Sequence, residues 1–173
     1  MKKNKLIPLL ILLFILIILA IYLIATNKSS TLKKEYVNFA IQDTNSIMQI
    51  FLADKNNNKV TLKRNDNNSW SVNNKFLASQ DQINILLKTL HLLEVQAPVA
   101  KAAYNNIIRQ LAARGIKVEI YQYKYRINLF NYIKLFPHIT KTKTFYVGDH
   151  TPTYIGTYMM IENADAPYVV NIP

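Results

Sequence analysis

The sequence contains no cysteine and only three glycines among its 173 residues. Without cysteine the chain has no disulfide bond, no thiol nucleophile and no cysteine that could carry a lipid. The scarcity of glycine excludes the glycine-rich loops that hold nucleotide phosphates, and the strained turn that presents a nucleophilic serine. The sequence alone therefore argues against several large classes of enzyme.

Histidine and acidic residues are also scarce, and they form no recognisable catalytic or metal-binding pattern. The three histidines are His91, His138 and His150, and no two of them have the spacing of metal ligands. Residues 54–58 resemble the start of a calcium-binding loop, but Lys59 stands where that loop needs glycine, so a hairpin turn is the better interpretation. We therefore predict a non-enzymatic protein with no cofactor and no metal ion.

Basic residues outnumber acidic ones by 21 to 10, which gives a formal net charge of +11. They are scattered along the chain, as on an ordinary solvated surface. The excess nevertheless suits a surface that faces anionic lipid head groups or another polyanion. We expect no nucleic-acid partner, and we keep an anionic glycan or lipid surface as an alternative partner.

One long apolar run stands out, because residues 6–25 contain no charged side chain. As a helix this run is about 30 Å long, close to the hydrocarbon thickness of a bilayer. Since Lys2, Lys3 and Lys5 precede it, a cleaved signal peptide is the competing interpretation. Two features favour an uncleaved anchor. The run exceeds the usual length of about 7–15 residues for the apolar region of a signal peptide, and Leu23 occupies a position that cleavage reserves for a small residue.

These features predict a cytoplasmic basic tip at residues 1–5, a transmembrane signal anchor at residues 6–25 and a linker at residues 26–35. Lys28, Lys33 and Lys34 follow the run, so the charge bias across it is small. A single N-terminal span before a long domain usually leaves the amino end in the cytoplasm. We therefore expect a single-pass protein of the inner membrane whose domain, residues 36–173, is exported.

The rest of the chain predicts an α+β domain. Alternating apolar and polar residues indicate an extended segment at residues 36–42 and an antiparallel meander over residues 47–77, with Trp70 packed on its apolar face. Later strands are expected from residue 118 into residues 121–130, and at residues 144–148, 156–162 and 168–172. Residues 94–99 are expected to be an extended connection.

Two amphipathic helices are expected to pack on this antiparallel sheet. The first begins at Ser79, with Gln82 completing a capping box, and continues to about residue 93. The second covers residues 101–114 and ends at Gly115, which we expect to adopt positive φ as a C-cap. The fold class is therefore α+β, an antiparallel sheet with two helices packed on it, preceded by one N-terminal transmembrane helix.

The candidate site lies in residues 121–138, where aromatic and basic residues interleave. Such interleaving is typical of nucleic-acid or glycan platforms, whereas an apolar strand and loop that docks on the core or on a partner is the alternative, and we favour it. On the expected strand three tyrosines share one face and two basic residues share the other. The predicted partner-binding face consists of Tyr121, Tyr123, Lys124, Tyr125, Arg126, Phe130 and Tyr132.

Several motifs together resemble an uncharacterised bacterial domain-of-unknown-function family (DUF four-three-four-zero). They lie at residues 50–54, 70, 98–103, 115–121, 126–130, 133–138, 146–148, 156–159 and 167–170. The resemblance implies an α+β domain in N-terminally anchored envelope proteins and in accessory parts of transporter systems, and it brings no catalytic or ligand residues. It also implies a longer chain, so we expect a shortened member whose last strand lacks a partner. The predicted partners are thus the membrane and envelope or transporter proteins.

Overall fold

The computed structural model describes residues 6–26, 37–129 and 133–172, and within these ranges the side chains of residues 8–20, 37–127 and 135–172. The chain divides into two compact units, Met1–Glu35 and Tyr36–Pro173. The predicted basic tip and residues 27–35 of the predicted linker lie outside the described residues.

The first unit contains helix α1 (Leu6–Thr26), which matches the helix expected over residues 6–25 and extends it by one residue. The side chains of residues 8–20 are all exposed within the chain, and they include the bulky apolar residues from Leu9 to Leu19. Within the part of the chain that the structure describes, no helix combines the length and apolarity needed to cross a membrane.

The second unit is an α+β domain built on one sheet, in which every strand pair is antiparallel. The spatial order of its strands is β4-β3-β2-β1-β6-β7-β8-β9-β5. The strands are β1 (Ile47–Ala53), β2 (Lys59–Arg64), β3 (Trp70–Val72), β4 (Phe76–Leu77), β5 (Glu94–Pro98), β6 (Ile116–Leu129), β7 (Ile133–His150), β8 (Thr157–Ile161) and β9 (Tyr168–Asn171). The expected meander is therefore confirmed as β1 to β4.

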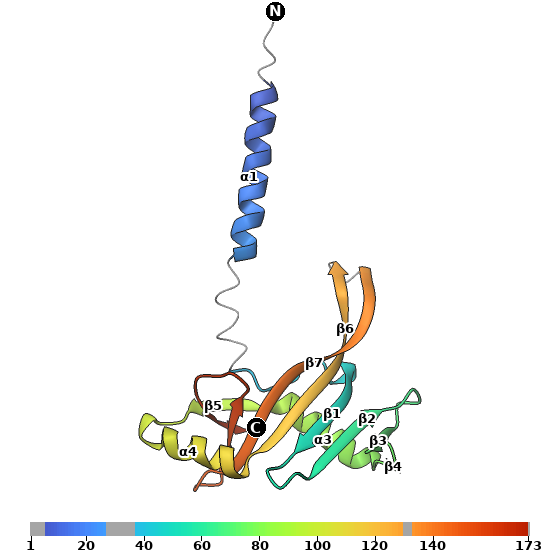
Figure 1. The fold of residues 1–173 in the computed structure, drawn as a ribbon, viewed down its shortest axis with the longest axis vertical. Coiled ribbons are helices and arrows are strands. Elements are labelled where there is room, and N and C mark those ends of the chain that lie inside the picture. Colours follow the sequence, from blue (N-terminus) through green and yellow to red (C-terminus); the bar gives the residue numbers. More distant parts are fainter. Residues whose placement is uncertain (1–5, 27–36, 130–132, 173) are drawn as a thin grey trace, which may run out of the picture. The chain divides into compact units, whose positions relative to one another are not determined.

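The two expected helices pack on opposite faces of the sheet (Figure 1). Helix α3 (Gln80–Leu92) buries Ile83 and Leu90 in the larger apolar cluster, which also contains Met159 of β8. Helix α4 (Lys101–Arg114) packs on a smaller cluster that includes Tyr158. Because neighbouring residues of a strand point to opposite faces, Met159 and Tyr158 place α3 and α4 on different sides of β8.

The ends of the helices differ from the sequence expectation. Ser79 is the N-cap of α3, but its side chain makes no capping hydrogen bond, so the predicted capping box is wrong. Gly115 is the C-cap of α4, yet its φ of −62° is an ordinary value for any residue. Glycine is favoured there for a steric reason, since a β-carbon at this position would collide with the carbonyl oxygen of Leu111.

The sequence predicts a strand at residues 36–42, but the described part of this segment, residues 37–42, does not join the sheet. Phe39 and Ile41 are buried in the core, as the alternating pattern suggested. The backbone of this segment bonds elsewhere: the Ile41 N–H donates to the Leu90 carbonyl of α3 at 2.9 Å, and the Lys143 ammonium donates to the Ala40 carbonyl at 2.9 Å. These partners replace the ladder that a strand would need. The short 3-10 helix η2 (Thr44–Ser46) follows, and it is capped by the side chain of Asp43.

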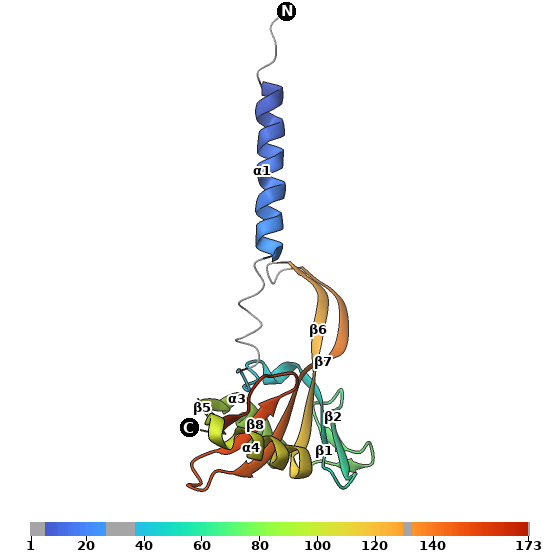
Figure 2. The same cartoon turned by 60° about the vertical axis from the view of Figure 1, so that its left-hand side comes forward.

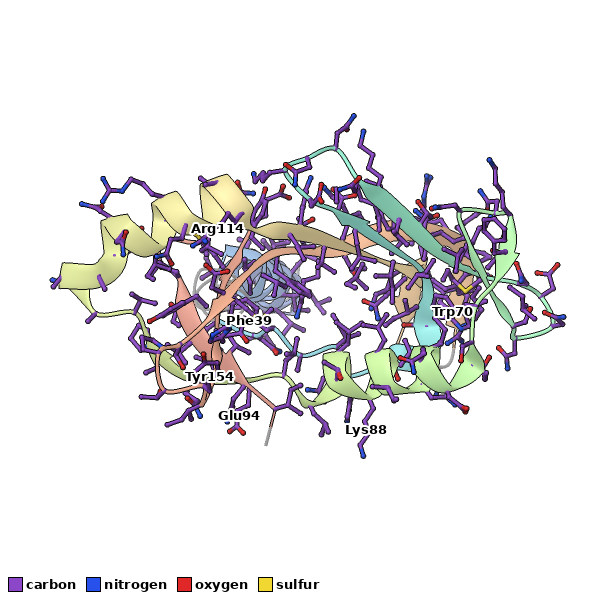
Figure 3. The ribbon with its side chains drawn as sticks, turned by 90° about the horizontal axis from the view of Figure 1, so that it is seen from below. Phe39, Trp70, Lys88, Glu94, Arg114 and Tyr154 are labelled. Atoms are coloured by element: carbon purple, nitrogen blue, oxygen red, sulfur yellow. The ribbon has the colours of Figure 1, made fainter. Side chains whose placement is uncertain are left out.

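Trp70 lies in the core with 1% of its surface exposed, which confirms the predicted packing. The Arg64 guanidinium lies 5.1 Å from its ring centroid. Phe39 makes an edge contact with Phe145, the ring centroids being 6.1 Å apart. Figure 3 shows Trp70 and Phe39 in different parts of the core, with α3 lying along one side of the domain.

The last strand is paired on both sides, so the expectation that it lacks a partner is wrong. In β9, Val170 pairs with Thr157 of β8 and with Val95 of β5. Residues 94–98, expected to be a plain connection, thus form β5 at the edge of the sheet. The pairing between β5 and β9 joins residues 70 to 77 positions apart, which short-range sequence patterns do not reveal.

Candidate partner-binding arm

The two longest strands, β6 and β7, continue beyond the rest of the sheet as a two-stranded ribbon. Strand β1 pairs with β6 only as far as Gln122, and β8 pairs with β7 only from Phe145 onward. Residues 123–129 of β6 and 133–139 of β7 therefore pair with each other and with no other described strand. We call these two segments the arm, and Figures 1 and 2 show it projecting from the body of the domain.

One face of the arm is apolar. Tyr123 pairs with Ile139, Tyr125 with Pro137 and Ile127 with Leu135, and side chains that pair across an antiparallel ladder point to the same face. We call this set of six residues the apolar face. Ile139 is 52% exposed and Leu135 is 47% exposed. Tyr125 is half-buried, and its ring meets that of Tyr123 edge-on at 5.4 Å.

The opposite side of the arm is basic. Lys124 pairs with His138, and Arg126 follows on the same side two residues later. Lys124 and Arg126 are both exposed, whereas His138 is half-buried. Its ring Nδ1 is enclosed and has no hydrogen-bond partner among the described residues. We call Lys124, Arg126 and His138 the basic face.

Phe136 adds a further exposed aromatic ring to the arm. It is 63% exposed, and its backbone has φ of 56°. A bulky residue rarely adopts this left-handed conformation, because its β-carbon crowds the backbone. The aromatic surface of the arm therefore comes from both strands.

The structure separates the predicted site residues into three groups. Tyr123, Lys124, Tyr125 and Arg126 lie on the arm, with the tyrosines on one face and the basic residues on the other, as the alternation predicts. Tyr121 lies below the arm, in the body of the sheet, where it pairs with Lys141. The side chains of Phe130 and Tyr132 lie outside the described residues.

Sequence reasoning missed the contribution of β7 to the apolar face, namely Leu135, Pro137 and Ile139. Their period-2 spacing was available as a signal. Pro137 obscured it, since proline within a run argues against a central strand. In the structure Pro137 is tolerated, because in the arm β7 is an edge strand with β6 as its only described neighbour.

A cluster of charged residues sits at the base of the arm around Glu119, which is buried. Its carboxylate lies 2.7 Å from the Lys117 ammonium and 3.6 Å from that of Lys141, and it accepts a 2.8 Å hydrogen bond from the Tyr121 hydroxyl. Glu162 approaches the same two lysines, at 4.0 and 3.6 Å. The cluster joins β6, β7 and the turn that follows β8.

The electrostatics of this cluster favour the charged forms of Glu119 and Lys117 and the neutral form of Tyr121. Burial alone would raise the pKa of Glu119, but hydrogen bonds from Lys117 and Tyr121 outweigh it, and the pKa is lowered. The hydrogen bond to Glu119 raises the pKa of Lys117, and it also raises the pKa of Tyr121. The arrangement therefore stabilises fixed charges, as a structural brace does, and places no proton near neutrality for acid–base chemistry.

The turn that resembled a calcium loop is a hairpin turn, as predicted. Asp54 Oδ1 accepts hydrogen bonds from the backbone N–H groups of Asn56 and Asn58, at 2.8 and 2.9 Å, and Oδ2 accepts one from the Asn58 side chain at 2.7 Å. The side-chain bond from Asn58 is the main reason that the pKa of Asp54 is lowered. Among the described residues, no three His, Asp or Glu side chains gather as metal ligands would.

Comparison of the chain with protein-family models, with curated proteins and with solved structures finds no match.

Proposed function

We propose that this protein is a membrane-anchored, non-enzymatic envelope protein that binds partner proteins through the apolar face of its arm. The observation that carries this proposal is the exposure of that face. Ile127, Leu135 and Ile139 are large aliphatic residues on a ribbon that projects from its domain, and all three are exposed. Contiguous exposed apolar surface of this kind marks interaction sites in soluble domains.

The backbone of the arm also favours a partner. A two-stranded ribbon is marginally stable in water on its own, and its outer edges carry N–H and C=O groups without a neighbouring described strand. A partner strand added to either edge would satisfy these groups, and a partner apolar surface would cover Ile127 and Ile139. Binding therefore stabilises the arm and buries its apolar face in one event.

The proposed anchor rests on the composition and exposure of α1. Residues 6–25 carry no charged side chain, and the described side chains of α1 are exposed on every side. A helix that is apolar all round needs an apolar surrounding, which a bilayer supplies. With the amino end in the cytoplasm, residues 36–173 would lie on the outer side of the inner membrane. Intact cells should then leave the domain open to added protease, and protection of the domain would reverse the orientation.

The resemblance to the DUF family suggests the kind of partner, namely subunits of a transporter or of another envelope machine. The binding test is extraction of the tagged full-length chain in mild detergent, followed by identification of the proteins that copurify. The arm variant carries Tyr123→Ser and Ile139→Ser. The matched control is Ile85→Ser, which removes an equally exposed isoleucine from α3.

We expect wild type and the Ile85→Ser control to capture the same partners, and the arm variant to lose them while its far-UV circular dichroism and melting temperature are unchanged. Equal capture by all three chains would contradict the proposal. A loss of folded structure in the arm variant would place these residues in the core, against their observed exposure.

The basic face supports a second candidate, direct binding to an anionic glycan or lipid surface. Lys124 and Arg126 are exposed on the same side of the arm. Their charged groups can therefore contact an anionic surface while the domain stays folded. Such binding weakens steeply with added salt, whereas a packed apolar contact does not. Cosedimentation with anionic vesicles across a salt series, using Lys124→Gln with Arg126→Gln as the variant, separates the two candidates.

A further inference from the structure

An apolar cavity of about 510 Å³ lies between α3 and the sheet, on the side opposite to α4. Its wall includes one core residue from each of five neighbouring strands: Ile50 of β1, Val118 of β6, Phe145 of β7, Met159 of β8 and Val170 of β9. Leu86, Leu90 and Leu93, from α3 and its C-cap, line the other side. This volume falls within the range of small-molecule sites in proteins, about 300–1,000 Å³.

The cavity opens to solvent through a mouth that is itself apolar. Ile116, Ile155 and Ile172 border it and are exposed, and Tyr154 beside them is 77% exposed. The ring of Tyr154 stacks on that of His150, with centroids 4.2 Å apart. A closed core would have buried these side chains, so the mouth is suited to admit an apolar group.

The side chains that line the cavity indicate an apolar ligand. Among the described residues, no Asp, Glu, Lys or Arg lines the cavity. Its side-chain polar groups are few: the hydroxyls of Thr89 and Thr157, the imidazole of His150, the phenol of Tyr154 and the amide of Asn171. An extended alkyl chain matches such a lining, and a polar head group would remain at the mouth.

We propose that this cavity binds the alkyl chain of a long-chain fatty carboxylate, with its head group at the mouth beside His150. The imidazole of His150 in the lining can donate a hydrogen bond to such a head group, and the excess of basic over acidic residues in the whole chain, 21 to 10, favours an anionic head group over a cationic one. This inference is independent of the proposed function, because the cavity lies in the body of the domain and the arm contributes no residue to its lining.

The test uses the full-length chain in its membrane and a long-chain fatty carboxylate that carries a photoreactive diazirine in its alkyl chain. After illumination, mass spectrometry locates the labelled peptides. We expect labelling of the peptides that contain Met159 and Val170, and competition by the unlabelled carboxylate. A fatty alcohol of equal length should compete less well, since it lacks the charge.

The variant that blocks the site is Thr157→Trp, which places an indole in the cavity from β8, and Leu86→Trp does the same from α3. A variant is used only if its melting temperature matches that of wild type. If one variant fails to fold, the other still tests the cavity. We expect a severalfold loss of labelling at Met159 in either variant. The arm variant Tyr123→Ser with Ile139→Ser serves as the matched control, and it should be labelled like wild type.

Two outcomes would overturn the proposal: labelling that stays outside the cavity, and labelling that both tryptophan variants leave unchanged. Equal competition by the fatty alcohol would overturn the assignment of a carboxylate head group. Because the arm variant reports on the proposed function separately, failure of one proposal does not imply failure of the other.

Discussion

The hydroxyl of Tyr121 donates a 2.8 Å hydrogen bond to the carboxylate of Glu119, two residues earlier on the same face of β6. This bond divides a row of three tyrosines that looks uniform in the sequence. Tyr121 belongs to the charged cluster of the sheet, whereas Tyr123 and Tyr125 begin the arm, two residues further along. The division between the cluster and the arm coincides with the N-terminal end of β1, where Ile47 pairs with Gln122 of β6.

Glu119→Gln should destabilise the domain by about 1–3 kcal/mol, the range found when a buried charged group loses a partner. The variant keeps an acceptor for Tyr121 but loses the attraction of the Lys117 and Lys141 ammonium groups. Denaturant unfolding of the full chain in mild detergent measures the change. Glu162→Gln is the matched control, since its carboxylate is more exposed and lies farther from the Lys117 ammonium, at 4.0 Å against 2.7 Å. Equal effects of the two substitutions would contradict the central role of Glu119.

Stability should fall on acidification through Glu119. Its pKa in the folded chain is lowered, so its contribution is complete above the ordinary glutamate pKa of about 4.3 and is lost as the pH falls through the lower folded value. Melting temperatures of wild type and Glu119→Gln should therefore converge below this ordinary pKa. A constant difference down to the lowest pH at which the chain stays folded would show that the carboxylate charge is irrelevant.

Two isoleucines of β6 should respond very differently to truncation. Ile120 is 0% exposed in the core and Ile127 is 40% exposed on the arm. Ile120→Ala should cost about 2–5 kcal/mol of folding free energy, as for other buried isoleucines. Ile127→Ala should change the stability by no more than about 0.5 kcal/mol and should weaken partner capture instead. Comparable destabilisation by both would mean that the arm packs on the domain as part of its core.

Much of the fold is predictable because local patterns dominate it. Helices α3 and α4 follow from their apolar periodicity, and the turn between β1 and β2 follows from Asp54 and the asparagines after it, which bond within the turn. The α+β class and the antiparallel sheet follow from these elements. Ser79 and Gly115 show the limit of such rules, since each occupies its predicted cap position without the predicted hydrogen bond or dihedral angle.

The remaining features depend on contacts between distant parts of the chain. Phe39 and Ile41 alternate like strand residues, but the Leu90 carbonyl and the Lys143 ammonium bond to the backbone of this segment, so it lies outside the sheet. The extent of the arm depends on where the pairing of β1 with β6 and of β8 with β7 ends. Residues 121–138 by themselves do not encode either boundary. The cavity likewise needs five strands and a helix to be in place before its lining can be identified.

The most direct test of the proposed function is site-specific photocrosslinking in intact cells. A photoreactive amino acid at Ile139 would probe the apolar face, and the same amino acid at Thr140 would probe the opposite face of the same strand. The account predicts a discrete adduct with another protein from position 139, and little or none from position 140. Equal adducts from both positions, or none from position 139, would contradict the assignment of the arm as the partner-binding surface.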